Sequence, residues 1–132
     1  LKNYQSINKI ISKLNINKIR TSLFINPKIK NIILSKKVGS KCIELHTGKL
    51  SNLVKSKKKY QDELIKIKKC SKFAKSIGLE VHAGHGINYK VAKVLSKINE
   101  IEEFNIGHFI IGESINEGLK NVIKKFKKII NK

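Results

Sequence analysis

The chain has 132 residues, of which 29 are lysine or arginine and nine are aspartate or glutamate, so its formal net charge is +20. Such a charge attracts nucleic acid, anionic lipid or phosphorylated metabolites. Specific reading of bases favours arginine, whose planar fork lysine lacks, and Arg20 is the only arginine in the sequence. Because the lysines recur on nearly every predicted helix, the composition argues against a dedicated nucleic-acid patch.

The sequence begins with Leu1 and contains no methionine, so we expect a piece of a longer protein, with an unconventional start as the alternative. Cys42 and Cys70 lack the close spacing of metal ligands, and Cys42 lies in an apolar pattern where a free buried thiol is common. Nothing resembles a secretory signal, and no apolar run is long enough to span a membrane. We therefore expect a cytoplasmic protein with no membrane partner.

The first part of the chain predicts a helix, a strand, a second helix and a second strand. Residues 4–14 have apolar side chains at helical spacing. Residues 19–25 predict a strand that Asn26 and Pro27 end, and the helix that follows stops near Gly39. Residues 42–46 predict the second strand.

The rest of the chain repeats this alternation. A polar loop through Lys58 leads to a long helix that ends near Ile77. A strand, a helix, a strand and a last helix are then predicted over residues 79–83, 89–98, 104–108 and 114–130. Since strand and helix alternate four times without a hairpin signal, the pattern predicts an α/β fold with a parallel sheet and helices outside it.

Three of the four predicted strands end on histidine and glycine. Ligands of parallel α/β folds bind at the carboxyl ends of the strands, so we expect His46, His85 and His108 on one rim. Glycine on both sides of His85 lets a ligand come close, and an imidazole there could transfer a proton or bind an anion. The alternative for His85 is a turn with a solvated histidine.

Other side chains near these strand ends are candidates with open alternatives. Glu44 faces either the interior of a closed barrel, where a buried acid needs a partner or a function, or water at a sheet edge. His46 is either a ligand contact or a support for Glu44. Gly107, with His108 after it, either presents its amide to an anion or serves close packing. His82 is expected to face the outer helices in a packing role.

Four segments in order resemble the pyridoxine 5′-phosphate synthase family, and the resemblance covers nearly the whole chain. They are residues 22–25, residues 43–48, residues 83–89, and residues 105–108 with 110–112. The resemblance implies a (β/α)₈ TIM barrel of which this chain holds the C-terminal half, the parallel strands five to eight. Residues 1–132 would then form a partial barrel domain whose N-terminal half is missing.

The resemblance also implies an enzyme of vitamin B6 biosynthesis, a transferase that works without metal or organic cofactor. The family condenses 1-deoxy-D-xylulose 5-phosphate with 3-amino-2-oxopropyl phosphate, closes the pyridine ring and releases phosphate and water. By resemblance, His85 is the proton donor and Glu44 is the carboxylate that stabilises a transition state. The positions matching contacts to the aminoketone phosphate are Gly86, Gly107 and His108.

The sequence departs from the family pattern at three positions. Asn26 stands where aspartate is usual, His82 where asparagine is common, and Glu113 where arginine is frequent, which changes the charge near the last helix. The remaining catalytic groups of the family lie in the first half, so we expect no activity from this piece alone. The resemblance implies a homo-oligomer with phosphorylated substrates and no nucleic acid. The competing hypotheses are a basic nucleic-acid-binding module and a decayed, non-catalytic remnant of the barrel.

Overall fold

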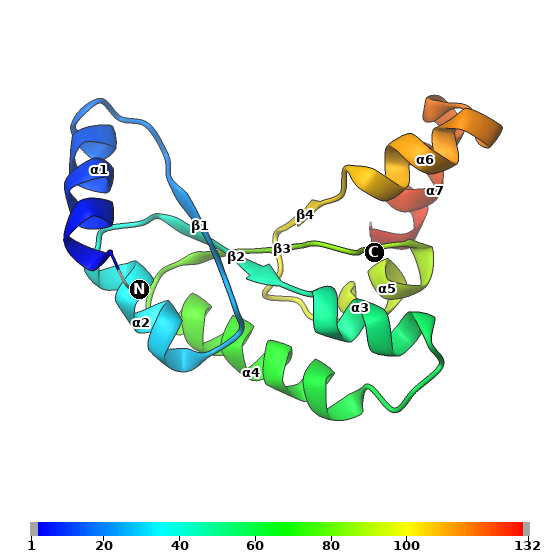
Figure 1. The fold of residues 1–132 in the computed structure, drawn as a ribbon, viewed down its shortest axis with the longest axis horizontal. Coiled ribbons are helices and arrows are strands. Elements are labelled where there is room, and N and C mark those ends of the chain that lie inside the picture. Colours follow the sequence, from blue (N-terminus) through cyan, green and yellow to red (C-terminus); the bar gives the residue numbers. More distant parts are fainter. Residues whose placement is uncertain (1–2, 131–132) are drawn as a thin grey trace.

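Four parallel strands form one sheet in the computed structural model, which describes residues 3–130 (Figure 1). The strands are β1 (Ser22–Ile25), β2 (Cys42–His46), β3 (Glu80–Gly84) and β4 (Glu103–Asn105). They lie side by side in the order of the sequence, and every neighbouring pair is parallel. The predicted parallel α/β sheet is therefore confirmed, and four such strands fit half of an eight-stranded barrel.

Helices precede, connect and follow the strands. They are α1 (Tyr4–Ile16), α2 (Ile29–Lys37), α3 (Gly48–Lys55), α4 (Gln61–Ser76), α5 (Tyr89–Leu95), α6 (His108–Glu117) and α7 (Leu119–Ile130). Helices α2 and α4 lie beside each other below the sheet in Figure 1, and α6 and α7 form a pair to the right of the sheet. No helix between residues 3 and 130 is long and apolar enough to cross a membrane.

The two faces of the sheet differ because side chains alternate along each strand. One face packs against the helices and forms the core, with fully buried side chains at Ile43, Leu45, Val81 and Ala83. The opposite face carries polar side chains, and the register aligns Glu44 of β2 with Phe24 of β1 and with His82 of β3. A helix-covered apolar face is what half of a barrel requires, and the polar face would then lie inside the barrel.

One predicted loop is helical. The polar stretch before Lys58 contains α3, and Leu50 of this helix is fully buried in the core. The polar residues around it mask a short amphipathic pattern, and burial of one face stabilises the helix. The prediction of an unstructured loop between the second strand and the long helix was wrong.

The C-terminal part of the chain also differs from its predicted boundaries. The fourth strand ends at Asn105, and His108 is the first residue of α6 rather than the end of the strand. The predicted helix over residues 114–130 is the end of α6 followed by α7, because Gly118 between them has a φ of +77°. Such a backbone conformation is readily available to glycine and ends a helix.

Candidate functional site

A cavity of about 910 Å³ lies at the carboxyl ends of the strands. It is lined by the inner face of β1 and β2, by the turn after β3, by the end of β4 and by the start of α6. The lining side chains are Phe24, Glu44, Lys55, His85, Gly86, Ile87, Asn105, Ile106, Gly107, His108, Phe109, Gly112 and Glu113. Its position matches the edge where ligands of parallel α/β proteins bind.

The five candidate residues all line this one cavity: Glu44, His85, Gly86, Gly107 and His108. They are contributed by β2, by the turn after β3 and by the segment that joins β4 to α6. The structure therefore brings together what the sequence placed at three separate strand ends. Their chemical roles stay predictions.

His46 does not line the cavity, but it supports one residue that does. The imidazoles of His46 and His85 stack with their centroids 4.5 Å apart, and the Phe24 ring lies 5.1 Å from His46 and 6.4 Å from His85. His46 therefore packs against His85, and no hydrogen bond to Glu44 is found for it among the described residues. Of the two open roles for His46, support of a neighbour fits, with His85 rather than Glu44 as the neighbour.

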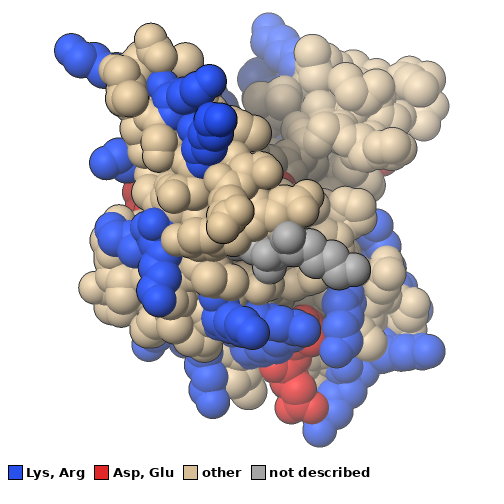
Figure 2. Space-filling view, turned by 60° about the vertical axis from the view of Figure 1, so that its left-hand side comes forward, with Lys and Arg blue, Asp and Glu red and all other residues tan. Residues whose placement is uncertain are grey.

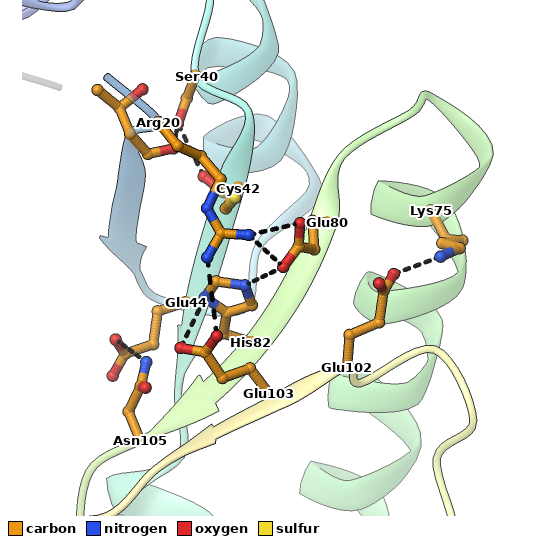
Figure 3. A network of polar contacts seen from close by, with 11 residues as sticks. Arg20, Ser40, Cys42, Glu44, Lys75, Glu80, His82, Glu102, Glu103 and Asn105 are labelled. Carbon is orange, nitrogen blue, oxygen red and sulfur yellow. Dashed lines mark hydrogen bonds and ion pairs between the residues drawn. The ribbon is translucent and has the colours of Figure 1, made fainter. Parts of the chain in front are cut away.

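Glu44 is held in the cavity by a hydrogen bond across the sheet. The Nδ2 of Asn105 donates to Oε2 of Glu44 at 2.7 Å, and the two side chains point toward each other in Figure 3. Between them, Gly84 leaves the necessary space, since a Cβ there would lie 1.8 Å from Oε1 of Glu44. Because β2 is an inner strand of the sheet, the alternative of a glutamate at a sheet edge is excluded.

His85 is exposed at the tip of a tight turn. Its φ is +78°, a left-handed conformation that residues other than glycine seldom adopt, and Gly86 has the same φ. The turn then enters α5, whose first turn is capped by Asn88, since its side chain accepts a hydrogen bond from the N–H of Val91 at 3.0 Å. The imidazole therefore stands on a turn that is fixed on its helical side.

Gly107 and His108 form the start of α6. Gly107 is the N-cap residue, no side chain caps the helix, and its first turn carries no acidic residue. The first backbone N–H groups of a helix have no partner within it, and its positive end favours anions. A Cβ at Gly107 would meet no atom within 4 Å, so close packing does not explain this glycine.

The prediction that His82 faces the outer helices was wrong. Its side chain lies on the same face of the sheet as Glu44, is only 2% exposed, and places Nε2 2.9 Å from Oε1 of Glu80. Arg20 donates to both oxygens of Glu80, at 2.8 and 2.9 Å, and Glu103 lies beside the same group (Figure 3). Glu80 and Glu103 begin their strands, so this network lies at the end of the sheet away from the cavity.

The charges and the burial in this network shift the pKa values of two of its members and bear on whether it could hold a metal ion. The hydrogen bond from His82 and the charge of Arg20 hold the pKa of Glu80 below its usual value, while burial raises the pKa of the Cys42 thiol. The donor atoms of Cys42, Glu80 and His82 lie within 4.8 Å of one another. Arg20 already neutralises Glu80 there, and a metal ion would have to displace it, so the cluster fits an ion pair better than a metal site.

Three polar or charged residues of the cavity lining were not among the predicted site residues. Lys55 belongs to α3, the helix that was predicted as a loop. Asn105 lies within a segment already singled out, and its polar side chain at the end of a strand was the available signal. Glu113 was noted only as a departure from a pattern, and it places a negative charge in the cavity lining.

The sheet is covered by helices on its apolar face, and its carboxyl edge gathers a carboxylate, imidazoles and a helix N-terminus. These features define an α/β protein with a candidate small-molecule site at that edge. Residues 1–132 match the family model described as "Pyridoxal phosphate biosynthesis protein PdxJ", and the chain belongs to this family. The family predicted from four short segments is thereby confirmed.

Curated relatives of this chain are named pyridoxine 5′-phosphate synthase. The relative from Pelagibacter ubique (strain HTCC1062) is 57% identical over 132 residues, which is 100% of this chain and 55% of the relative. The relative from Sulfurihydrogenibium sp. (strain YO3AOP1) is 46% identical over 85% of this chain and 45% of its own length. The relative from Zymomonas mobilis is 42% identical over 96% of this chain and 48% of its own length. The chain spans about half the length of these relatives.

Proposed function

We propose that this chain is the C-terminal half of a pyridoxine 5′-phosphate synthase and supplies strands five to eight of a (β/α)₈ barrel. The support is the run of four parallel strands in sequence order and a match to 55% of the Pelagibacter relative. Within residues 3–130, β1 and β4 each pair with a strand on one side only. In this proposal residues 1–132 are a partial barrel domain, and both edges join strands of the other half.

Several large apolar side chains are exposed, which supports the proposal that this chain is part of a larger structure. Phe24 on the inner face of β1 is 54% exposed, and Ile111, Ile115 and Leu119 near the C-terminal end are 65%, 83% and 55% exposed. Large apolar side chains of this kind are normally buried against further protein. In the complete enzyme they would be covered by the other half of the barrel or by another subunit of a homo-oligomer.

The proposed reaction is the condensation of 1-deoxy-D-xylulose 5-phosphate with 3-amino-2-oxopropyl phosphate to pyridoxine 5′-phosphate, phosphate and water. The observation that carries this proposal is the convergence of Glu44, His85, Gly107 and His108 on one cavity at the carboxyl edge of the sheet. That convergence joins the residues of three matching segments in the place where barrel enzymes hold their substrates.

Each side chain has a role that its surroundings permit. Ring closure passes through imine, enamine and dehydration steps, in which departing oxygens need protons, and the exposed imidazole of His85 is the proposed donor. Glu44 would stabilise positive charge on an iminium intermediate, with its orientation held by Asn105. The phosphate of the aminoketone would bind at Gly86 and at the start of α6, where Gly107 and His108 present the helix N-terminus.

The test uses this chain completed by the part of the Pelagibacter ubique synthase that it does not match, as one fused polypeptide. We expect the completed protein to form pyridoxine 5′-phosphate from the two substrates, measured by mass spectrometry, and the unfused chain to form none. His85→Asn in the completed protein should abolish product, while Lys72→Gln, an exposed substitution on α4, should not. Absence of product from the unmodified completed protein would contradict the proposed function, and full turnover by His85→Asn would remove that residue from the mechanism.

The proposal includes a cytoplasmic homo-oligomer that binds phosphorylated small molecules. The competing nucleic-acid module depends on the net charge of +20, and Figure 2 shows lysines spread over several parts of the face in view rather than gathered in one place. A nucleic-acid module would bind a duplex with an affinity that falls steeply with salt. We expect the completed protein to lack such binding at physiological salt while retaining turnover, whereas a decayed remnant would lack both.

A further inference from the structure

The turn that carries His85 is attached to the residue that precedes α3. The N–H of Thr47 donates to the carbonyl of Gly84 at 2.9 Å. The Oγ1 of Thr47 lies 2.8 Å from that carbonyl and 2.9 Å from the carbonyl of His85, so its single proton is shared between two acceptors. The hydroxyl of Ser51, one turn into α3, lies 3.3 Å from the same carbonyl of His85.

These bonds hold a strained part of the backbone. His85 and Gly86 both have a φ of +78°, and for His85 this conformation persists only where neighbouring groups impose it. Thr47 is fully buried, so water does not replace its hydroxyl as a partner of the two carbonyls. The hydroxyl is therefore placed to determine the direction of the peptide that follows His85.

Close packing against α3 leaves the turn little freedom. A Cβ at Gly48 would lie 2.8 Å from Cδ2 of His85 and 2.6 Å from Cε1 of His46, and a Cβ at Gly86 would lie 3.0 Å from Cβ of Ser51. The absence of a side chain at Gly48 lets the two stacked imidazoles lie directly over the start of the helix. The start of α3 thus serves as the support on which His85 lies.

We propose that Thr47, assisted by Ser51, is a positioning residue that sets the direction in which His85 enters the cavity. Neither side chain lines the cavity, so Thr47 acts through His85 and not on the substrate. The inference rests on the proposed function, in which His85 donates a proton. The start of α6 makes none of these bonds, so Thr47 acts on proton transfer by His85 and, through the peptide between His85 and Gly86, only on the Gly86 part of the aminoketone phosphate site.

The test compares three variants of the fused, completed protein. Thr47→Val keeps the shape of the side chain and removes the hydroxyl, and Thr47→Ser keeps the hydroxyl. Thr21→Val is the matched control, because Thr21 is also buried and its hydroxyl has no hydrogen-bond partner within the described part of the chain. We expect Thr47→Val to lower kcat by on the order of 100-fold, the cost of a misplaced catalytic group. KM for the aminoketone phosphate should rise by a smaller factor, because the peptide that turns carries the N–H of Gly86 while the start of α6 stays in place. Thr47→Ser should restore kcat, and Thr21→Val should equal the unmodified protein.

A second measurement separates this inference from the proposed function. Crystal structures of the same fused variants give φ of His85, which we expect to remain positive in Thr47→Ser and to leave the left-handed region in Thr47→Val. An unchanged φ together with an unchanged kcat in Thr47→Val would overturn the inference, as would a change in KM alone. If the unmodified completed protein forms no product, the proposed function fails, and φ of His85 in the two Thr47 variants decides the inference by itself.

Discussion

Substitution of Gly84 by alanine tests the geometry of the cavity most directly. The added Cβ would lie 1.8 Å from Oε1 and 2.7 Å from Cδ of Glu44, and 3.3 Å from Cβ of Asn105. Ordinary van der Waals contact begins near 3.4 Å, so the carboxylate would have to withdraw by about 1.6 Å. Such a shift breaks the 2.7 Å hydrogen bond from Asn105 and takes Glu44 out of the position in which it faces the cavity.

The expected cost of Gly84→Ala follows from this displacement. Overpacking a well-packed core costs about 1–3 kcal/mol. Here the added Cβ meets the end of a flexible side chain that faces an open cavity, and the Glu44–Asn105 pair is exposed, so the cost lies at or below the lower end of that range. We therefore expect the free energy of unfolding of the completed protein to fall by about 1 kcal/mol or less. Turnover should fall with it, since Glu44 is the proposed electrostatic stabiliser.

Urea unfolding and steady-state kinetics measure the two effects. Gly112→Ala is the control for stability, because Gly112 lies inside α6 and an added Cβ meets no atom within 4 Å, so alanine should stabilise by about 0.5–1 kcal/mol. In the double variant Gly84→Ala with Glu44→Ala, the steric part of the loss should disappear. A Gly84→Ala protein with unchanged stability and unchanged turnover would refute the reasoning.

Three further predictions follow from the same contacts. Asn105→Ala should lower kcat/KM about tenfold, the value of one hydrogen bond to a charged group. Asn105→Asp should lower it further, because two carboxylates would then face each other. Equal kinetics for both variants and the unmodified protein would contradict the role of Asn105 in orienting Glu44. The pKa of Glu80 is lowered in the fold, so its contribution to stability is complete above its ordinary pKa of about 4.3 and is lost as the pH falls through the lowered pKa. Glu80→Gln should therefore flatten the acid side of the stability curve of the completed protein, measured by urea unfolding from pH 6 to about 2. The unfused chain should aggregate or melt without cooperativity in calorimetry, and a sharp two-state melt of a monomer would contradict the half-barrel proposal.

Local patterns were sufficient for the order of the strands and for their alternation with helices, but not for α3 or for the division between α6 and α7. Strand and helix alternate in the sequence because each strand has a short apolar run and each connecting helix has apolar residues at helical spacing. The period of two that puts Cys42, Glu44 and His46 on one face of β2 is also present in β3 and the residue before it, where Leu79, Val81 and Ala83 alternate with Glu80 and His82. Applied there, it would have placed His82 correctly, so that error lay in the interpretation and not in the signal.

The contacts that organise the cavity were beyond any local pattern. Asn105 and Glu44 are 61 residues apart, Thr47 and His85 are 38 residues apart, and both pairs meet only because the strands adopt one particular register. That register depends on burial of the apolar face against the helices, which involves the whole chain. The sequence alone therefore determined the kind of fold, the family and the candidate residues, whereas the packed sheet decided which partner orients each of them.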